Sequence, residues 1–127
     1  MDVRTDSQQA IEIRMAATPV WIPVARSVAT ELADRANFDR DSTTDIRVAV
    51  DEACAAAAAQ TPDDATVTCA FTVTPGRMEV HVTSPATRDP APFAALSWRM
   101  LRAVTDELSL RHHPGHLFSI RLAKRQK

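Results

Sequence analysis

Glu52 is the residue of this chain whose type and surroundings best suit chemistry, because it is a carboxylate at the border of an apolar helix face. It lies in the segment 45–59, which reads DIRVAVDEACAAAAA. Helix formers dominate this segment and neither Gly nor Pro interrupts it, which predicts a helix. Ala56, one helical turn after Glu52, lies on the same edge of the apolar face. A carboxylate held there suits a general base or a metal ligand, whereas a solvated glutamate is the simpler interpretation.

The same segment resembles the N box of the GHKL (Bergerat-fold) ATPases, in the form found in anti-sigma factors of the RsbW/SpoIIAB type. That family typically reads D-[IL]-x-[LI]-A-V-[SD]-E-A-x-x-N-[AV], and Asp45 and residues 49–53 match it. The resemblance implies that Glu52 is the general base, and that an Asn at the position of Ala56 holds Mg²⁺ on the ATP phosphates. Ala56 cannot take over that role, because a methyl group offers no oxygen to a hard cation.

Length and composition indicate one ordinary soluble domain. The chain has 127 residues, of which 45% are hydrophobic and 24% charged. A net charge of −1 leaves no basic surface for direct nucleic-acid binding. The chain has no apolar run of about 20 residues for a membrane span and no signal sequence at its N-terminus, so we expect a cytoplasmic protein. Only two glycines occur, which argues against a Gly-rich phosphate loop, and the two cysteines match no zinc or CxxC spacing.

Hydrophobic periodicity predicts the order β-α-α-β-β-α-β-β. Residues 1–9 are expected to be a flexible terminus, and residues 10–124 a single domain. Ser42 followed by Asp45 predicts a capping-box-like start of the second helix. The order predicts an α+β two-layer sandwich, with a largely antiparallel mixed sheet covered on one face by three helices. The predicted helices are 18–36, 43–59 and 93–108, and the predicted strands centre on 11–15, 67–73, 78–83, 110–112 and 118–122.

The family resemblance extends from Ile11 to Lys124, but its later nucleotide motifs are altered. Where the family has Asp-x-Gly, whose Asp recognises adenine, this chain has Ser84-Pro85-Ala86. Where the family has Gly-x-Gly, it has Ala95-Leu96-Ser97. The loop between these motifs is shorter than the ATP lid of the family. Asp106 and Glu107 match an Asp-Glu pair of the following helical segment.

These substitutions define a degenerate nucleotide pocket. Its expected positions are Glu52, Ala56, Ser84 and Ser97. Ser84 can form a hydrogen bond but has no carboxylate for the adenine amino group, and the loss of one such polar contact costs about 1–3 kcal/mol. We therefore expect ATP and Mg²⁺ to bind weakly or not at all.

Other candidate sites are less supported by the residues. His112, His113 and His116 flank a Pro-Gly turn; polar turn residues are the simpler interpretation, since a tetrahedral zinc site needs more converging ligands. A Ser/His/Asp hydrolase lacks the Gly-x-Ser-x-Gly elbow. Charged residues of the first two helices, such as Arg26 and Arg47, are expected to be solvated, and in an anti-sigma factor they could also contact and steer a partner.

The resemblance implies an anti-sigma factor that sequesters an alternative sigma factor and is released when a STAS-domain anti-anti-sigma factor competes. The first alternative is an active ATP-dependent serine/threonine kinase that phosphorylates this antagonist. The second is a stand-alone regulatory domain with a different partner. Related proteins are often dimers, and an apolar strand at residues 11–15 would lie at a sheet edge, so a homodimer is a further expectation.

Overall fold

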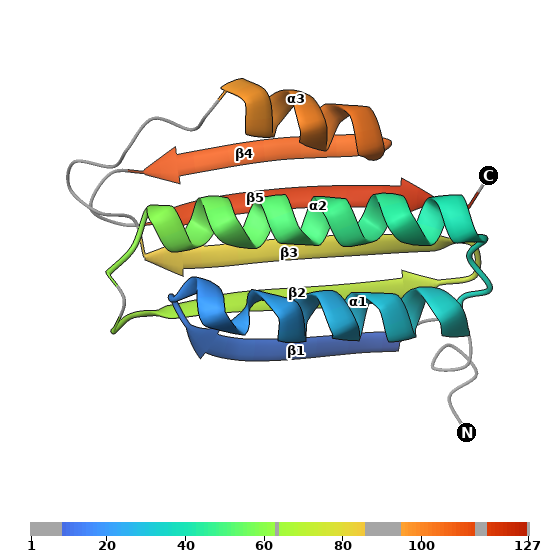
Figure 1. Ribbon diagram of the computed structural model, residues 1–127, viewed down its shortest axis with the longest axis horizontal. Coiled ribbons are helices and arrows are strands. Elements are labelled where there is room, and N and C mark those ends of the chain that lie inside the picture. Colours follow the sequence, from blue (N-terminus) through green and yellow to red (C-terminus); the bar gives the residue numbers. More distant parts are fainter. Residues whose placement is uncertain (1–8, 63, 86–94, 114–116, 127) are drawn as a thin grey trace.

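The protein is a two-layer α+β sandwich, as the sequence predicts. The computed structural model describes residues 9–62, 64–85, 95–113 and 117–126. Five antiparallel strands form one sheet in the order β1-β2-β3-β5-β4, and three helices cover one of its faces (Figure 1). The elements are β1 (Gln9–Ala16), a 3₁₀ turn (Pro19–Trp21), α1 (Ile22–Arg35), α2 (Arg40–Ala59), β2 (Thr66–Thr74), β3 (Arg77–Pro85), α3 (Ala95–Val104), β4 (Glu107–His113) and β5 (Leu117–Arg125).

The core lies between the sheet and α2, which crosses the middle of the helical layer between α1 and α3 (Figure 1). Alternate residues of β2 and β3 are buried against this layer, which is the period-two pattern of a sheet with one covered face. The buried side chains of α2 are mostly small, so the helix backbone can approach the sheet closely. The fully buried residues of α2 are Ser42, Ile46, Ala49, Val50, Ala53, Cys54 and Ala57.

The spacing of Val20, Val24, Val28 and Leu32, with Ala25 and Ala29 beside them, predicts the buried face of the first helix, and the structure differs from it at the two outer valines. Val20 is 70% exposed and Val24 is 48% exposed, whereas Ala25 and Ala29 are fully buried. Leu32 of the same row is 2% exposed and Val28 is partly buried against the core, so the predicted face is confirmed except at Val20 and Val24. The predicted start at residue 18 is also replaced by a 3₁₀ turn that precedes the α-helix.

The start of α2 lies earlier than predicted. Asp39, not Ser42, is the N-cap, and its Oδ1 accepts a hydrogen bond from the Ser42 N–H at 2.7 Å. Asn37 has a φ of 60°, and this left-handed conformation ends α1 as the sequence suggests. The capping-box interpretation is therefore wrong by one helical turn, because a stronger cap at Asp39 precedes it.

The third helix is shorter than predicted. It ends at Val104, and Glu107 is already paired with Ala123 in the sheet. The Asp106 N–H donates to the Ala123 carbonyl at 2.9 Å, and the Asp106 carboxylate accepts from the Arg125 N–H at 2.6 Å. The Asp-Glu pair therefore joins the start of β4 to β5 instead of ending a helix. Residues 93 and 94 lie outside the described residues.

The uncovered face of the sheet is polar and carries a network of charged side chains. Glu79 accepts hydrogen bonds from Arg77 at 3.3 Å and Arg121 at 2.9 Å, and His81 Nε2 lies 2.8 Å from Ser119 Oγ. Burial, and then the positive charge of Arg121, lower the pKa of His81 below its ordinary value. The neutral form of His81 is therefore favoured on this face at neutral pH.

The two cysteines are free and buried, as expected. Cys54 of α2 and Cys69 of β2 lie against each other in the core. The hydrogen bond with Cys54, and then burial, raise the pKa of the Cys69 thiol. A protonated thiol is a poor nucleophile, so this pair acts as small apolar packing. Among the described helices, none is both long and apolar enough to cross a membrane.

One ion pair joins α2 to the end of the sheet through the covered layer. Lys124 Nζ of β5 lies 3.0 Å from Asp45 Oδ2 of α2. The Lys124 side chain is only 6% exposed, whereas that of Asp45 is 25% exposed. Water therefore reaches Asp45 more easily than Lys124, and the buried ammonium group depends on the ion pair to stabilise its charge.

We expect Asp45→Ala to lower the free energy of unfolding by about 3–5 kcal/mol, because it leaves the buried Lys124 ammonium without a counter-ion. Lys124→Met should cost less, since Asp45 can take up water in its place. Urea denaturation of both variants tests this. Glu31→Ala, which removes the exposed pair with Arg35, is the control and should change stability by less than about 1 kcal/mol. Equal losses in the two core variants would contradict the assignment.

Candidate functional site

Glu52 and Ala56 lie one turn apart on α2, on its border with the buried face. Both side chains are half-buried, next to the fully buried Ala53 and Ala57. Within the described part of the chain, no residue forms a hydrogen bond or ion pair with Glu52. The carboxylate is therefore placed at the edge of the core as the spacing predicts, without a group that holds it in one orientation.

Ser84 lies at the end of β3, beside the last turn of α2. It is only 3% exposed, and its Oγ donates to the Ala57 carbonyl at 3.5 Å. This carbonyl belongs to the last turn of α2 and also accepts a hydrogen bond from the Gln60 N–H at 3.1 Å. The hydroxyl is thus engaged with the backbone of α2, and Ser84 is not bonded to Glu52.

Ser97 is a half-buried residue in the first turn of α3. α3 packs against α2, so the structure brings the two helices that carry Ser97 and Glu52 together. The side chains of Ala95 and Leu96 lie outside the described residues, as does the whole segment 86–94 that corresponds to the expected lid and to Ala86.

The described residues do not fit an ordinary Mg²⁺·ATP site. Mg²⁺ needs oxygen ligands, and Ala56 offers a methyl group at the position where the family has an amide oxygen. Adenine recognition needs a carboxylate, and Ser84 offers a hydroxyl that already donates to Ala57. Glu52 keeps the residue type of a general base, and neither Ala56 nor Ser84 supplies the group that the family has at its position.

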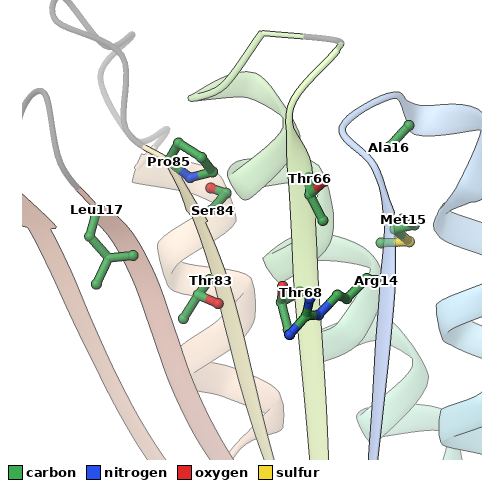
Figure 2. A pocket seen from close by; sticks show the side chains of 9 residues that line it. All are labelled: Arg14, Met15, Ala16, Thr66, Thr68, Thr83, Ser84, Pro85 and Leu117. Atoms are coloured by element: carbon green, nitrogen blue, oxygen red, sulfur yellow. The ribbon is translucent and has the colours of Figure 1, made fainter.

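Sequence reasoning missed a hollow of about 510 Å³ on the uncovered face of the sheet. Figure 2 shows that its side chains come from neighbouring strands and that Arg14 lies over Thr68. The register explains this row, because Arg14 is opposite Thr68 and Thr68 is opposite Thr83. Alternating threonines in β2 would have indicated a polar face but not its curvature. The lining residues are Arg14, Met15, Ala16, Thr66, Thr68, Thr83, Ser84, Pro85 and Leu117.

Two grooves flank α1, one charged and one apolar. The charged groove, between α1 and α2, includes Arg26 and Arg47 and has a volume of about 500 Å³. At its side, Arg26 Nη1 lies 3.1 Å from Asp51 Oδ2, and both side chains are about one-third exposed. The apolar groove, between α1 and β1, has a volume of about 450 Å³ and includes Ile11 and Val24. The first groove is also lined by Glu31 and Asp34, so it carries charges of both signs.

The three histidines considered for a zinc site lie at the end of β4 and in the segment that follows it. The side chains of His112 and His113, and the whole of His116, lie outside the described residues. Within the remainder of the chain, no group of three or more His, Cys, Asp or Glu side chains could hold a metal ion.

Comparison with known families gives one match that spans most of the chain. Residues 15–116 match the family described as histidine kinase-like ATPase domain. Two curated relatives, both named anti-sigma-F factor RsbW and both from Mycobacterium tuberculosis (strains CDC 1551 and H37Rv), are each 28% identical to this chain. Each alignment covers 93% of this chain and 74% of the relative.

A solved structure has the same fold. It is that of the RsbU and RsbW domains of Rv1364c from Mycobacterium tuberculosis, with a TM-score of 0.74 over 92% of this chain and 19% sequence identity. This chain spans only 32% of that chain's length. At this identity the likeness establishes the fold, and it agrees with the sheet and helical layer described above.

We expect Ser84→Asp to destabilise the protein more than Ser84→Ala, although Asp is the residue that the nucleotide motif has there. The alanine variant loses one long hydrogen bond, which is worth about 1 kcal/mol. The aspartate variant buries a carboxylate against the Ala57 carbonyl oxygen, which should raise its pKa.

The extra loss in Ser84→Asp should grow as the pH rises above about 4, the ordinary pKa of Asp, because the unfolded chain then releases a proton that the folded chain retains. Thermal unfolding of the two variants from pH 4 to pH 8 measures the difference. If Ser84→Asp were as stable as wild type at neutral pH, Ser84 would face an open site.

Proposed function

The chain belongs to the histidine kinase-like ATPase domain family, and from this premise we propose that it is an anti-sigma factor of the RsbW type that sequesters an alternative sigma factor. The observation that carries the proposal is the similarity to anti-sigma-F factor RsbW over 93% of this chain. The matched region includes all three helices and the strands β2, β3 and β4. The similarity therefore covers the fold that would form the binding surface and is not limited to one short motif.

The altered nucleotide positions favour binding over catalysis. Ala56 and Ser84 replace the groups that would contact metal and base, yet the fold around them is intact. Loss of nucleotide contacts leaves the outer surfaces of α1 and α2 unchanged, including the charged groove with Arg26 and Arg47. Such charges speed up association with a complementary partner. Release of the sigma factor would then come from competition by a STAS-domain anti-anti-sigma factor.

An active serine/threonine kinase is the second candidate, because Glu52 is retained at a half-buried position on α2. A general base accelerates phosphoryl transfer only when the phosphate is positioned and its charge is neutralised. The described residues near Glu52 provide neither, so we place this activity second.

The first prediction is direct binding. Co-purification of the tagged chain from its source cells, followed by mass spectrometry, should recover a sigma factor. With that sigma factor purified, Arg47→Glu should slow association about tenfold at low salt, because it reverses a charge in the groove. Arg99→Glu on α3, which reverses another exposed arginine, is the control and should leave the rate nearly unchanged. Recovery of other partners without a sigma factor would contradict the proposal.

The second prediction concerns nucleotide. Titration calorimetry with ATP and Mg²⁺ should give no micromolar binding, because two lost polar contacts together weaken affinity by about 2–6 kcal/mol. Glu52→Gln should behave like the wild type. Micromolar binding, together with phosphate transfer to a STAS protein that Glu52→Gln abolishes, would establish the kinase instead.

A further inference from the structure

β2 and β3 separate at the end of the sheet that holds the hollow. Their register runs from the hairpin turn to the pair Thr68 and Thr83, and it ends there. β2 nevertheless stays paired with β1 as far as Thr66, and β3 stays paired with β5 as far as Pro85. Figure 2 shows the two strands diverging toward Thr66 and Pro85. The hollow of about 510 Å³ is lined by residues from both sides of this opening.

Pro85 explains why the ladder stops at this place. The two residues that flank the turn of the β2–β3 hairpin form a hydrogen-bonded pair, and such pairs recur at every second residue. Thr68 and Thr83 are one of these pairs, and Thr66 with Pro85 would be the next. Proline has no N–H group, so Pro85 cannot donate to the Thr66 carbonyl. This carbonyl is therefore directed toward β3 without its ladder donor, as an acceptor at the side of the opening.

Arg14 supplies the single positive charge among the described residues that line the hollow. Its side chain extends across β2 beside Thr68 (Figure 2), and it is 74% exposed. In the described part of the chain, its one hydrogen bond joins its Nε to Glu12 Oε1 at 3.3 Å. Both Nη groups are therefore available to a ligand. A guanidinium presents these N–H groups in one plane, with the spacing of the two oxygens of a carboxylate.

The hydroxyl groups of Thr68 and Thr83 lie beside this guanidinium on the same face of the sheet. Arg14 is opposite Thr68, and Thr68 is opposite Thr83, so the three residues form one row across neighbouring strands. Side chains directly opposite each other in such a row have Cβ atoms about 5 Å apart. Both threonines are half-buried, and no described residue forms a hydrogen bond with either hydroxyl. Two neutral donors therefore adjoin the positive charge.

The other side of the hollow is apolar. Leu117 of β5 is 40% exposed, and Pro85, which is opposite Leu117 in the register, is also exposed. A ligand that covers these side chains would remove apolar surface from water. The volume of about 510 Å³ lies within the range of small-molecule sites, which is about 300–1,000 Å³. The hollow thus combines one charged end with one apolar end.

We propose that the hollow binds a small organic monocarboxylate with an apolar body. The carboxylate accepts hydrogen bonds from the Arg14 guanidinium and from the hydroxyls of Thr68 and Thr83. The apolar body packs against Leu117 and Pro85. The proposal does not rest on the anti-sigma function, because the hollow is on the face of the sheet that the helices leave uncovered.

The charges around the hollow select a monoanion over a dianion such as phosphate. Glu12 lies beside Arg14 and offsets part of its single positive charge. The Thr66 carbonyl adds a partial negative charge at the side of the opening. A second negative charge on the ligand would therefore be repelled without a cation to balance it.

Chemical-shift titration of the full chain with cyclohexanecarboxylate tests the site. The amide signals of Arg14, Thr68 and Thr83 should shift and should saturate in the millimolar range or below. Cyclohexanecarboxamide keeps the apolar body without the charge, and acetate keeps the charge without the body, so each should bind at least about tenfold more weakly. Inorganic phosphate should bind no better than acetate. Absence of a saturable shift, or equal binding of the amide or of phosphate, would overturn the proposal.

Three exposed positions give matched variants. Arg14→Gln should weaken binding of cyclohexanecarboxylate about tenfold, whereas Glu12→Gln should strengthen it about threefold, because it removes the competing carboxylate. Arg111→Gln is the control, since Arg111 lies at the far end of the same row, opposite Ser119, which is opposite Thr83. It removes the same charge from the same face and should leave the affinity unchanged. Equal losses in Arg14→Gln and Arg111→Gln, or no loss in Arg14→Gln, would overturn the proposal.

Discussion

Close packing of α2 on the sheet is the constraint on which the rest of the structure depends. Small side chains, mostly alanines, let the helix backbone approach strands that carry larger residues such as Phe71 and Phe118. The same approach places Ser84 within reach of the Ala57 carbonyl and Lys124 within reach of Asp45. The candidate site is therefore shaped by how near the two layers lie, as much as by the identities of its residues.

The sequence predicts the strands and the central helix well because their patterns are local. Alternation in β2 and β3 and the alanine-rich face of α2 each contain enough information to identify an element and its buried side. The antiparallel sheet with one covered face then follows from the order of elements. The edge position of β1 was also predictable, since the first strand has no hairpin partner before it.

The errors arise where tertiary contacts override a local pattern. Val20 and Val24 look like the start of a core stripe, but both are exposed, and only Val28 and Leu32 farther along the row reach the core. Ser42 looks like a helix cap, but Asp39 precedes it with a better placed carboxylate. The role of Ser84 depends on a carbonyl 27 residues away. The residue pattern of one segment cannot predict a contact with a segment so far along the chain. Nor can it predict the hollow between Arg14 and Thr83.

The alanine-rich second half of α2 limits how a signal could cross this molecule. From residue 53 to residue 59 every residue but Cys54 is alanine. A methyl side chain has no rotamers to exchange, so this stretch cannot pass on a change by repacking its side chains. A perturbation at the end of β3 can reach the outer face of α2 only if the whole helix tilts or slides as a rigid body. Any coupling between the sheet and the outer surface of α2 therefore requires rigid-body movement of the helix.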